Sequence, residues 1–319
     1  MCGIAGELRF DQVMADLHVV AVMTRDQAPR GPDGEGLFSL GSRAFGHRRL
    51  RIMDLSQRAH QPFIDNELGL GVVFNGAIYN HEALRKELAA QGYRFASSGD
   101  TEVIIKAWHA WGPAALDRFA GMFAFALWER DSGVTHLVRD RLGIKPLYYS
   151  ATPQRLRFAS TRPALLAGGD INTTLDPVAL HHYLSLHAAV PVPHTILQAV
   201  RKLPPATHMS VQPDGRTDSR TWWRLDFSRK PDDLQRPFEA WRDLRRATLR
   251  DAVRRRTVAD VPVGVLLSGG VDSSLITGLP AETGTPDLRT YAIGFETVDG
   301  EAGEEFRYSD LVSSVPTSS

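Results

Sequence analysis

The sequence predicts an α+β domain of stacked sheets covered by helices, followed by the start of an α/β domain with a parallel sheet. Over about the first 160 of the 319 residues, short apolar runs alternate with glycine, proline and aspartate, as in strands joined by turns. Helical spacing appears there at two places, so a regular strand–helix alternation is not expected. Nearer the other end, a five-residue apolar run precedes a loop of glycines and serines and then a helical pattern.

The elements of the first domain follow from the spacing of its apolar residues. Apolar runs predict buried strands over residues 70–74, 122–128 and 135–139. Helices are predicted over residues 81–91 and 101–111, where apolar side chains recur at intervals of three and four. Asp176 followed by Pro177 predicts a further helix, because aspartate caps helix N-termini and proline fits the first turn.

A polar, proline-bearing stretch over residues 225–237 predicts a linker. A helix is expected over about residues 239–258, a strand over 263–267, a loop over 268–274 and a helix beginning near Ser274. Another strand is expected over 288–295. The predicted domains are therefore 2–221, a linker over 222–237, and 238–319.

Composition excludes several classes of partner. Lysine plus arginine and aspartate plus glutamate number 37 each, so the formal net charge is zero and neither nucleic acid nor an anionic membrane is expected as a partner. The arginine-rich stretch 242–256 is interleaved with leucine and valine, which favours an amphipathic helix with a solvated face over a nucleic-acid surface. No apolar run approaches the ~20 residues that cross a bilayer, and no signal peptide is apparent.

The cysteine and histidine residues bear on whether the chain forms a disulfide or binds a metal. With one cysteine, no internal disulfide can form, and a reducing cytoplasm is the expected location. His181 and His182 lie in a predicted helix without further ligand spacing, which favours packing or surface exposure over metal binding.

The single cysteine stands at position 2, where removal of the initiator methionine would expose it as the first residue. Its thiol would then lie beside a free α-amine, whose ordinary pKa is about 7.7–8.0. Such an amine can accept the thiol proton, so one residue would supply both nucleophile and base. Gly3 leaves room for a substrate to approach.

Four further motifs follow Cys2 in order: RGPD at 30–33, GHRRL at 46–50, FNGAIYN at 74–80 and SGDTE at 98–102. Together with Cys2 they resemble the class II glutamine amidotransferases, over residues 1 to about 221. The resemblance implies the four-layer α+β sandwich of the N-terminal-nucleophile (Ntn) hydrolases. It also implies release of ammonia from glutamine, with Cys2 as the nucleophile.

The resemblance gives the motif residues roles that fit glutamine, which carries a free carboxylate and a free ammonium. Arg49 would clamp the carboxylate and Asp100 would hold the ammonium. The side chain of Asn75 and the backbone N–H of Gly76 would form the oxyanion hole. Each residue also has a structural interpretation: Arg49 as a surface charge, Asn75–Gly76 as a turn, and Asp100 as a helix cap.

One position departs from the family pattern. Many class II amidotransferases of this type carry glutamate after the Asn-Gly pair, where this chain has Ala77. The resemblance therefore implies that Asp100 and backbone groups around Ala77 carry more of the contact with the substrate ammonium.

The loop SGGVDSS at residues 268–274 is suited to anions, because its glycines let backbone N–H groups turn toward a phosphate at a helix N-terminus. It resembles the pyrophosphate loop of the ATP pyrophosphatases and lacks the Walker pattern. The resemblance implies ATP and Mg²⁺ as cofactors, with Asp272 as the metal ligand. The residues implied to contact ATP are Leu267, Ser268, Gly269, Gly270, Asp272, Ser273 and Ile293.

An amidotransferase followed by this loop resembles the asparagine synthetase family, and residues 176–184 with 201–205 look most like its N-acetylglutaminylglutamine amidotransferase branch. The resemblance implies a carbon–nitrogen ligase that uses ammonia from glutamine to amidate an ATP-activated carboxylate, either aspartate or the dipeptide. Expected partners are these small molecules and a second copy of the chain, in a homodimer.

The resemblance to the synthetase half fails after Leu311, and residues 312–319 are expected to form a disordered tail. We expect a truncated synthetase half. Two alternatives stay open: a remnant with glutaminase activity only, and a non-catalytic partner of an intact homologue.

Overall fold

The computed structural model describes residues 1–229, 231–282, 288–294 and 306–314. The chain divides into two compact units, Met1–Leu225 and Asp226–Ser319. The first unit ends at Leu225, where the polar stretch predicted as a linker begins. Part of that stretch is helical, since α7 spans Pro231–Leu234.

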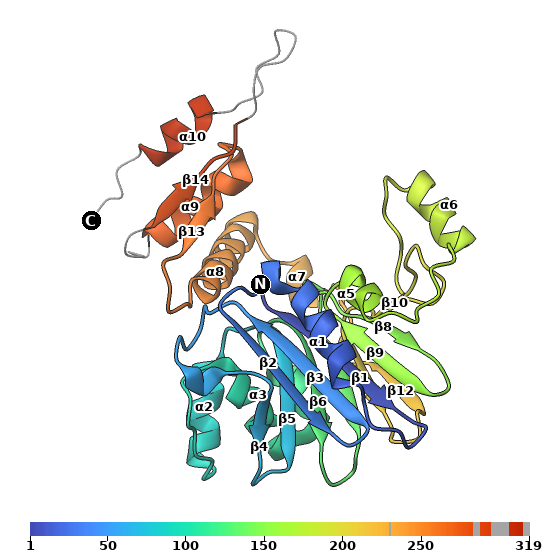
Figure 1. Cartoon of the computed structure of the whole chain (residues 1–319). Helices are drawn as coiled ribbons and strands as arrows, with labels where there is room; N and C mark the ends of the chain where they lie inside the picture. Colours follow the sequence, from blue (N-terminus) through green and yellow to red (C-terminus); the bar gives the residue numbers. More distant parts are fainter. Residues whose placement is uncertain (230, 283–287, 295–305, 315–319) are drawn as a thin grey trace. The chain divides into compact units, whose positions relative to one another are not determined.

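The first unit contains two antiparallel six-stranded sheets (Figure 1). One sheet has the order β10-β8-β9-β1-β3-β2. Its strands are β1 (Gly3–Arg9), β2 (Gly34–Leu40), β3 (Arg43–Arg49), β8 (Tyr148–Ala151), β9 (Arg155–Ala159) and β10 (Arg201–Lys202). The other sheet has the order β12-β11-β7-β6-β5-β4. Its strands are β4 (Phe63–Asp65), β5 (Leu70–Ile78), β6 (Gly121–Glu129), β7 (Thr135–Arg139), β11 (Thr207–Val211) and β12 (Thr217–Thr221).

The two sheets face each other across an apolar core, and helices cover their outer faces (Figure 1). In that core the rings of Phe45 on β3 and Trp128 on β6 stack at 4.2 Å between centroids. Outside β5 lie α2 (His81–Ala90) and α3 (Asp100–Trp111), and outside the other sheet lie α1 (Leu17–Asp26) and α5 (Arg162–Ala167). This arrangement is the predicted four-layer α+β sandwich.

Shorter elements complete the first unit. They are η1 (Ala28–Arg30), η2 (Gln57–Ala59), η3 (Gly112–Ala114), α4 (Ala115–Arg118) and α6 (Pro177–Ser185). The predicted cap of α6 is confirmed, because the side chain of Asp176 accepts hydrogen bonds from the backbone N–H groups of Val178 and Ala179.

Among its described residues, the second unit has two parallel strands, β13 (Gly264–Leu266) and β14 (Arg289–Tyr291), together with helices α8 (Phe238–Arg256), α9 (Val271–Glu282) and α10 (Phe306–Ser313). It is the start of the predicted α/β domain. On α8, Arg246 and Arg250 pair with Glu282 at the end of α9, as expected for a solvated, charged face.

Several predicted boundaries were wrong by a few residues. β5 continues to Ile78, because its backbone stays paired with β6 as far as Gly121. Asn75 and Gly76 are therefore in a strand, and their interpretation as a turn was wrong. The helix after the loop begins at Val271 rather than Ser274, and α10 extends to Ser313 within the segment predicted as a disordered tail. Residue 295 of the strand predicted over 288–295 and residues 315–319 of the predicted tail lie outside the described residues.

Candidate active site

Cys2 immediately precedes β1 and is half-buried beside the end of β3. Its Sγ lies 3.4 Å from the backbone nitrogen of Leu50, which donates to it, and 3.7 Å from the Leu50 carbonyl oxygen. Burial raises the pKa of the Cys2 thiol. The negative charge of Asp100 raises this pKa further, whereas the positive charge of Arg49 lowers it. A thiol in these surroundings needs a base to become a nucleophile.

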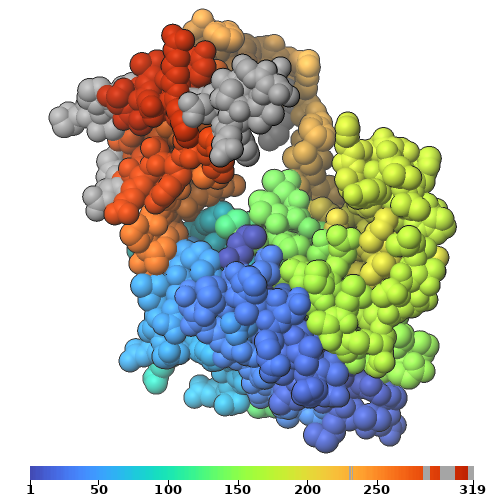
Figure 2. Space-filling model, turned by 45° about the horizontal axis from the view of Figure 1, so that its top comes forward, coloured from blue at the N-terminus to red at the C-terminus, as the bar shows by residue number. Residues whose placement is uncertain are grey.

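The amine nearest Cys2 in the structure belongs to Met1, which is half exposed; the dark blue start of the chain reaches the surface in Figure 2. Burial lowers the pKa of this amine; the Cys2 charge opposes that change, and the positive charges of Arg30 and Lys145 reinforce it. Once Met1 is removed, the α-amine of Cys2 itself would lie among the same charges. A lowered pKa favours the neutral amine, which is the form that accepts a proton.

Arg30 and Lys145 are two residues at this site to which no role was assigned from the sequence. Arg30 Nε donates to the Cys2 carbonyl oxygen at 3.1 Å, and Lys145 Nζ lies 2.9 Å from the Met1 sulfur. Arg30 belongs to the RGPD motif, which indicated the family but not the contact. Lys145 is buried. In the sequence it is a single charged residue between apolar neighbours, and this pattern is the signal that could have indicated a buried lysine.

Arg49 ends β3 and is buried, so its interpretation as a surface charge was wrong. Its Nη1 donates to the Ser56 carbonyl oxygen at 2.8 Å, and its Nη2 donates to the Asp54 carbonyl oxygen. These contacts fix the plane of the guanidinium and use two of its five N–H donors. The remaining donors can bind a carboxylate.

Asp100 is the first residue of α3 and is buried. Its Oδ2 accepts a hydrogen bond of 2.9 Å from the backbone N–H of Ile78, at the end of β5. Burial raises the pKa of Asp100. A cation such as an ammonium group would favour the ionised form of a carboxylate in this position.

Asn75 lies on β5 and is buried, yet neither its side-chain nitrogen nor its side-chain oxygen has a hydrogen-bond partner among the described residues. A buried amide without partners is costly in a folded protein and commonly marks a functional role. Alternation along the strand points Asn75 and Val73 to the same side, toward the facing sheet, where Val73 belongs to the core cluster that also includes Ile4 and Phe45.

Gly76 follows on the same strand, where close packing against β6 requires a glycine. A Cβ added there would lie 2.3 Å from the Met122 carbonyl oxygen and 2.7 Å from the Phe123 Cα. Ala77 comes next and pairs with Met122. The strand therefore brings Asn75, Gly76 and Ala77 together in consecutive positions, with Asp100 bonded to its end.

His47 and Asp54 also support this region, and no role was predicted for either of them. The Nε2–H of His47, on β3, donates to the Phe74 carbonyl oxygen of β5 at 3.1 Å and so connects the two sheets. Burial lowers the pKa of His47 to about 3, so the ring stays neutral. Asp54 accepts backbone N–H groups from the turn before Asp100. No local pattern distinguishes such long-range contacts.

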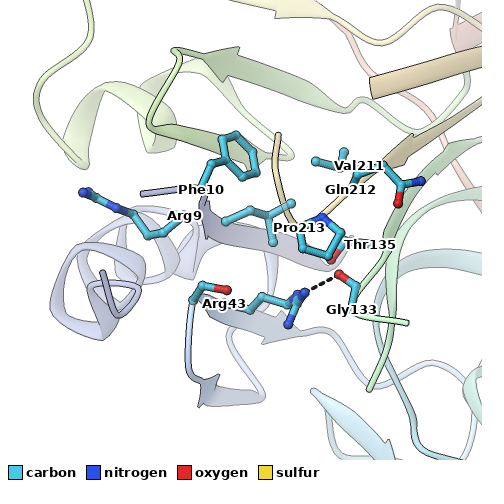
Figure 3. A pocket seen from close by; sticks show the side chains of 10 residues that line it. Arg9, Phe10, Arg43, Gly133, Thr135, Val211, Gln212 and Pro213 are labelled. Carbon is cyan, nitrogen blue, oxygen red and sulfur yellow. Dashed lines mark hydrogen bonds between the residues drawn. The ribbon is translucent and has the colours of Figure 1, made fainter. Parts of the chain in front are cut away.

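Two cavities of the first unit lie apart from these residues. One has a volume of about 10 Å³, room for roughly one water molecule, and lies where β1 ends, near Arg43 and Pro213 (Figure 3). The other, of about 350 Å³, is lined by Tyr148, Arg162 and Lys202 among others. Neither is lined by a residue predicted to bind glutamine.

The predicted nucleotide loop connects β13 to α9 in the second unit. Ser268 and Ser273 share a hydrogen bond of 3.1 Å between their hydroxyls, and Ser274 Oγ donates to the Gly270 carbonyl at 2.8 Å. Gly269 has φ +84°, and a Cβ there would lie 2.4 Å from the Tyr308 Cβ, so this position requires glycine. The loop thus places backbone N–H groups and hydroxyls at the start of a 12-residue helix, which suits a phosphate group.

The remaining predicted nucleotide contacts differ in exposure. Leu267 is buried and its backbone N–H donates to the Tyr291 carbonyl at 2.8 Å, whereas Ile293 is 71% exposed. Asp272 lies exposed in the first turn of α9, with its carboxylate available to a cation. In the described part of the chain, no cluster of three or more histidine, cysteine, aspartate or glutamate side chains is placed to hold a metal ion. Within the same residues, no helix is long and apolar enough to span a membrane.

Comparison with known families assigns both parts of the chain. Residues 1–223 match the family described as glutamine amidotransferase domain, and residues 244–315 match the family described as asparagine synthase. The first of these matches covers well over half of the chain.

Curated relatives agree with this assignment. Asparagine synthetase [glutamine-hydrolyzing] 1 of Bacillus subtilis is 35% identical over 300 residues, covering 93% of this chain and 46% of the relative. Asparagine synthetase [glutamine-hydrolyzing] 3 of the same organism is 33% identical over 306 residues, covering 94% of this chain and 49% of the relative. The chain thus spans about half the length of these relatives.

Solved structures agree on the fold. Glutamine phosphoribosylpyrophosphate amidotransferase of B. subtilis aligns over 91% of this chain and 65% of its own, with a TM-score of 0.51 and 17% identity. A structure described as the allosteric regulatory enzyme of purine biosynthesis aligns over 93% and 66%, with a TM-score of 0.52 and 17% identity. The chain belongs to the glutamine amidotransferase family through residues 1–223, and this domain is followed by a segment that matches the asparagine synthase family.

Proposed function

We propose that the first unit hydrolyses glutamine to glutamate and ammonia, with Cys2 as the nucleophile. One observation carries this proposal: Arg49, at the end of β3 and directly before the Leu50 whose N–H donates to Cys2 Sγ, and Asp100, at the start of α3, both act electrostatically on the Cys2 thiol. A cation, an anion and a nucleophile around one point match the carboxylate, the ammonium and the side-chain amide of glutamine.

In the proposed reaction, Cys2 Sγ attacks the side-chain amide carbon of glutamine, and the thiol proton passes to the α-amine of Cys2. Collapse of the tetrahedral intermediate breaks the carbon–nitrogen bond. The leaving nitrogen takes up that proton and departs as ammonia, leaving a γ-glutamyl thioester. Water then attacks the thioester carbon, and glutamate and the free thiol are released. With Met1 in place the Cys2 nitrogen is a peptide nitrogen and cannot accept the proton, so activity requires removal of Met1.

Binding and charge stabilisation fall to the residues around the sulfur. Arg49 holds the substrate carboxylate with the donors that Ser56 and Asp54 leave free, and Asp100 holds the ammonium. Asn75 donates its side-chain N–H to the oxyanion, together with the backbone N–H of Gly76. The unpartnered amide of Asn75 supports this role, since a substrate oxygen would satisfy it.

For the whole protein we propose amidation of a carboxylic acid by the ammonia released from glutamine, driven by ATP. ATP supplies the activation of the acceptor carboxylate, as an adenylate, when it is bound. Ser268, Gly269, Gly270 and Ser273 would hold its phosphates, Leu267 and Ile293 would face the adenine, and Asp272 would bind Mg²⁺. The proposed acceptor is aspartate or N-acetylglutaminylglutamine, and we propose the cytoplasm as the location. A homodimer stays a prediction.

The test is to measure glutamate and ammonia released by the purified chain and by Cys2→Ala. The chain should release both products in equal amounts, and the alanine variant should release neither while melting at the wild-type temperature. Glutamate release by Cys2→Ala at the wild-type rate would refute the assignment of the nucleophile. Pyrophosphate is measured separately with MgATP and each acceptor, because pyrophosphate formed together with an amidated product would extend the proposal to synthesis by this chain.

A further inference from the structure

A short segment after β3 connects the two charged residues of the proposed glutamine site. The guanidinium of Arg49 rests on the carbonyl oxygens of Asp54 and Ser56, as described above. Asp54 has φ +48°, a left-handed conformation that is uncommon outside glycine, asparagine and aspartate. The position of this segment therefore decides where the Arg49 guanidinium points.

The Asp54 carboxylate is buried and holds two segments at once. Its Oδ1 accepts hydrogen bonds of 3.0 Å from the backbone N–H of Ser56 and 2.5 Å from the Ser56 hydroxyl. Its Oδ2 accepts bonds of 2.7 Å and 3.2 Å from the backbone N–H groups of Ser98 and Gly99. Gly99 directly precedes Asp100, so a single carboxylate joins the support of Arg49 to the residue before the ammonium ligand.

The ionisation state of Asp54 fits this bridging role. Burial opposes ionisation, but hydrogen bonds from Ser56 and Ser98 outweigh it and lower the pKa of Asp54 to about 2. The group is therefore a carboxylate at neutral pH, and an ionised acceptor makes shorter and stronger hydrogen bonds than a neutral one.

The turn before Asp100 is also held from its other side. Arg85 on α2 donates to the Ser97 and Gly99 carbonyl oxygens at 2.9 Å and 2.6 Å. Arg85 thus fixes the turn to α2, whereas Asp54 fixes it to the segment that orients Arg49. Only the second connection relates the two substrate-binding charges to each other.

We propose that Asp54 is a positioning residue that sets the separation between Arg49 and Asp100 and so makes the site select ligands with a carboxylate and an ammonium on one carbon. This inference rests on the proposed glutaminase function. Both charges of an α-amino acid can be satisfied together only if their partners keep a fixed distance, and misplacement by about 1 Å can cost on the order of a hundredfold in rate. Asp54 touches neither the substrate nor the sulfur in this account.

The experiment compares glutamine with glutaramate, which is glutamine without its α-amino group, as substrates of the full chain. The quantity measured is the ratio of kcat/KM for glutamine to that for glutaramate, obtained from ammonia release. In Asp54→Asn this ratio should fall about tenfold, because the variant keeps the shape of the side chain but cannot accept both sets of bonds. A loss of folded protein alone would lower both kcat/KM values equally and leave the ratio unchanged.

Asp176→Asn is the matched control. Asp176 is also a buried carboxylate that accepts two backbone N–H groups, at 3.0 Å and 3.1 Å, but it caps α6 instead of joining the glutamine-binding segments. Its ratio should equal that of the wild type. Ser56→Ala removes only the hydroxyl on Asp54 Oδ1 and should lower the ratio about threefold, which keeps the test available if Asp54→Asn does not fold.

The outcomes separate the inference from the function on which it rests. If the wild type releases ammonia and the ratio is unchanged in Asp54→Asn, the role of Asp54 is overturned and the proposed function stands. If Asp54→Asn does not fold, an unchanged ratio in Ser56→Ala has the same meaning. Absence of ammonia release from the wild-type chain without Met1 would overturn the proposed function and this inference with it. A fall in the ratio for Asp176→Asn equal to that for Asp54→Asn would also overturn the inference.

Discussion

The Asp100 carboxylate accepts a hydrogen bond of 2.9 Å from the backbone N–H of Ile78, three residues beyond Asn75 on the same strand. This bond joins the first turn of α3 to the end of β5. The proposed ammonium ligand is thereby fixed relative to the proposed oxyanion hole, which lies on the paired and rigid part of the strand. Strand β5 thus positions both the proposed ammonium ligand and the proposed oxyanion hole.

Arg49→Ala should raise the KM for glutamine about ten- to a hundredfold, since a charge-assisted hydrogen bond contributes about 1.5–3 kcal/mol. Arg49→Lys should restore only part of the loss, because lysine is a point charge without the paired donors of a guanidinium. The measurement is steady-state glutamate release against glutamine concentration. Arg48→Ala is the control, as the neighbouring Arg48 pairs with Glu35 instead. An unchanged KM in Arg49→Ala would remove Arg49 from the binding site.

Asn75→Ala should lower kcat by about 10²–10³ with little change in KM, as expected for loss of an oxyanion donor. It should not lower the melting temperature, because the Asn75 amide makes no hydrogen bond with the described residues that its loss would break. Asn80→Ala should behave in the opposite way. The Asn80 amide bonds the Arg118 carbonyl at 3.0 Å and the Ala120 N–H at 2.9 Å, so its loss should cost stability and leave kcat intact.

The contrast between these two variants decides the role of Asn75. Thermal melts and initial rates are recorded for both proteins under the same conditions. A destabilised Asn75→Ala with wild-type kcat would identify Asn75 as a structural residue and contradict the proposed oxyanion hole.

The stability of the first unit should fall as the pH decreases below about 6.5, in part because of His47. Its pKa is lowered to about 3 in the folded state, whereas histidine in an unfolded chain titrates near 6.5. Between these values the unfolded chain binds the proton and the folded one does not, so each step toward lower pH favours unfolding. At pH 5 the loss from this one residue is about 2 kcal/mol relative to neutral pH.

The measurement is the free energy of unfolding between pH 7.5 and 5 for the wild type, His47→Gln and His18→Gln. Glutamine can still donate to the Phe74 carbonyl but does not titrate, so the dependence on pH should be shallower by about 2 kcal/mol in His47→Gln. His18 is exposed on α1, and its replacement controls for the loss of one histidine. Equal slopes in His47→Gln and the wild type would show that His47 is not the group concerned.

The features of this protein that could be predicted from the sequence are those that local patterns determine. Apolar runs located β6 and β7. The resemblance carried by the ordered motifs predicted roles for Cys2, Arg49, Asn75, Gly76 and Asp100, and these roles stay proposals. The end of β5 was missed, because Asn75 and Gly76 have turn propensity locally and are held in the strand by pairing with β6.

The supporting residues could not be found in this way, since their contacts join segments far apart in the chain. Asp54 and Ser98 are 44 residues apart, and Lys145 lies 144 residues from Met1. Such contacts depend on the packing of the two sheets, and a single sequence carries no local signal for them. Exposure of residues such as Ile293 is likewise a property of the fold alone.

The most direct test of the account is covalent labelling of the chain with a glutamine analogue that carries a diazoketone in place of the side-chain amide. Intact mass and peptide mapping should find one adduct per chain, on Cys2, in molecules that lack Met1. Glutamine should slow the labelling, and Arg49→Ala should require a higher concentration of the analogue. An adduct on another residue would contradict Cys2 as the nucleophile. So would glutamate release from a chain in which a saturating concentration of the analogue leaves Cys2 unlabelled.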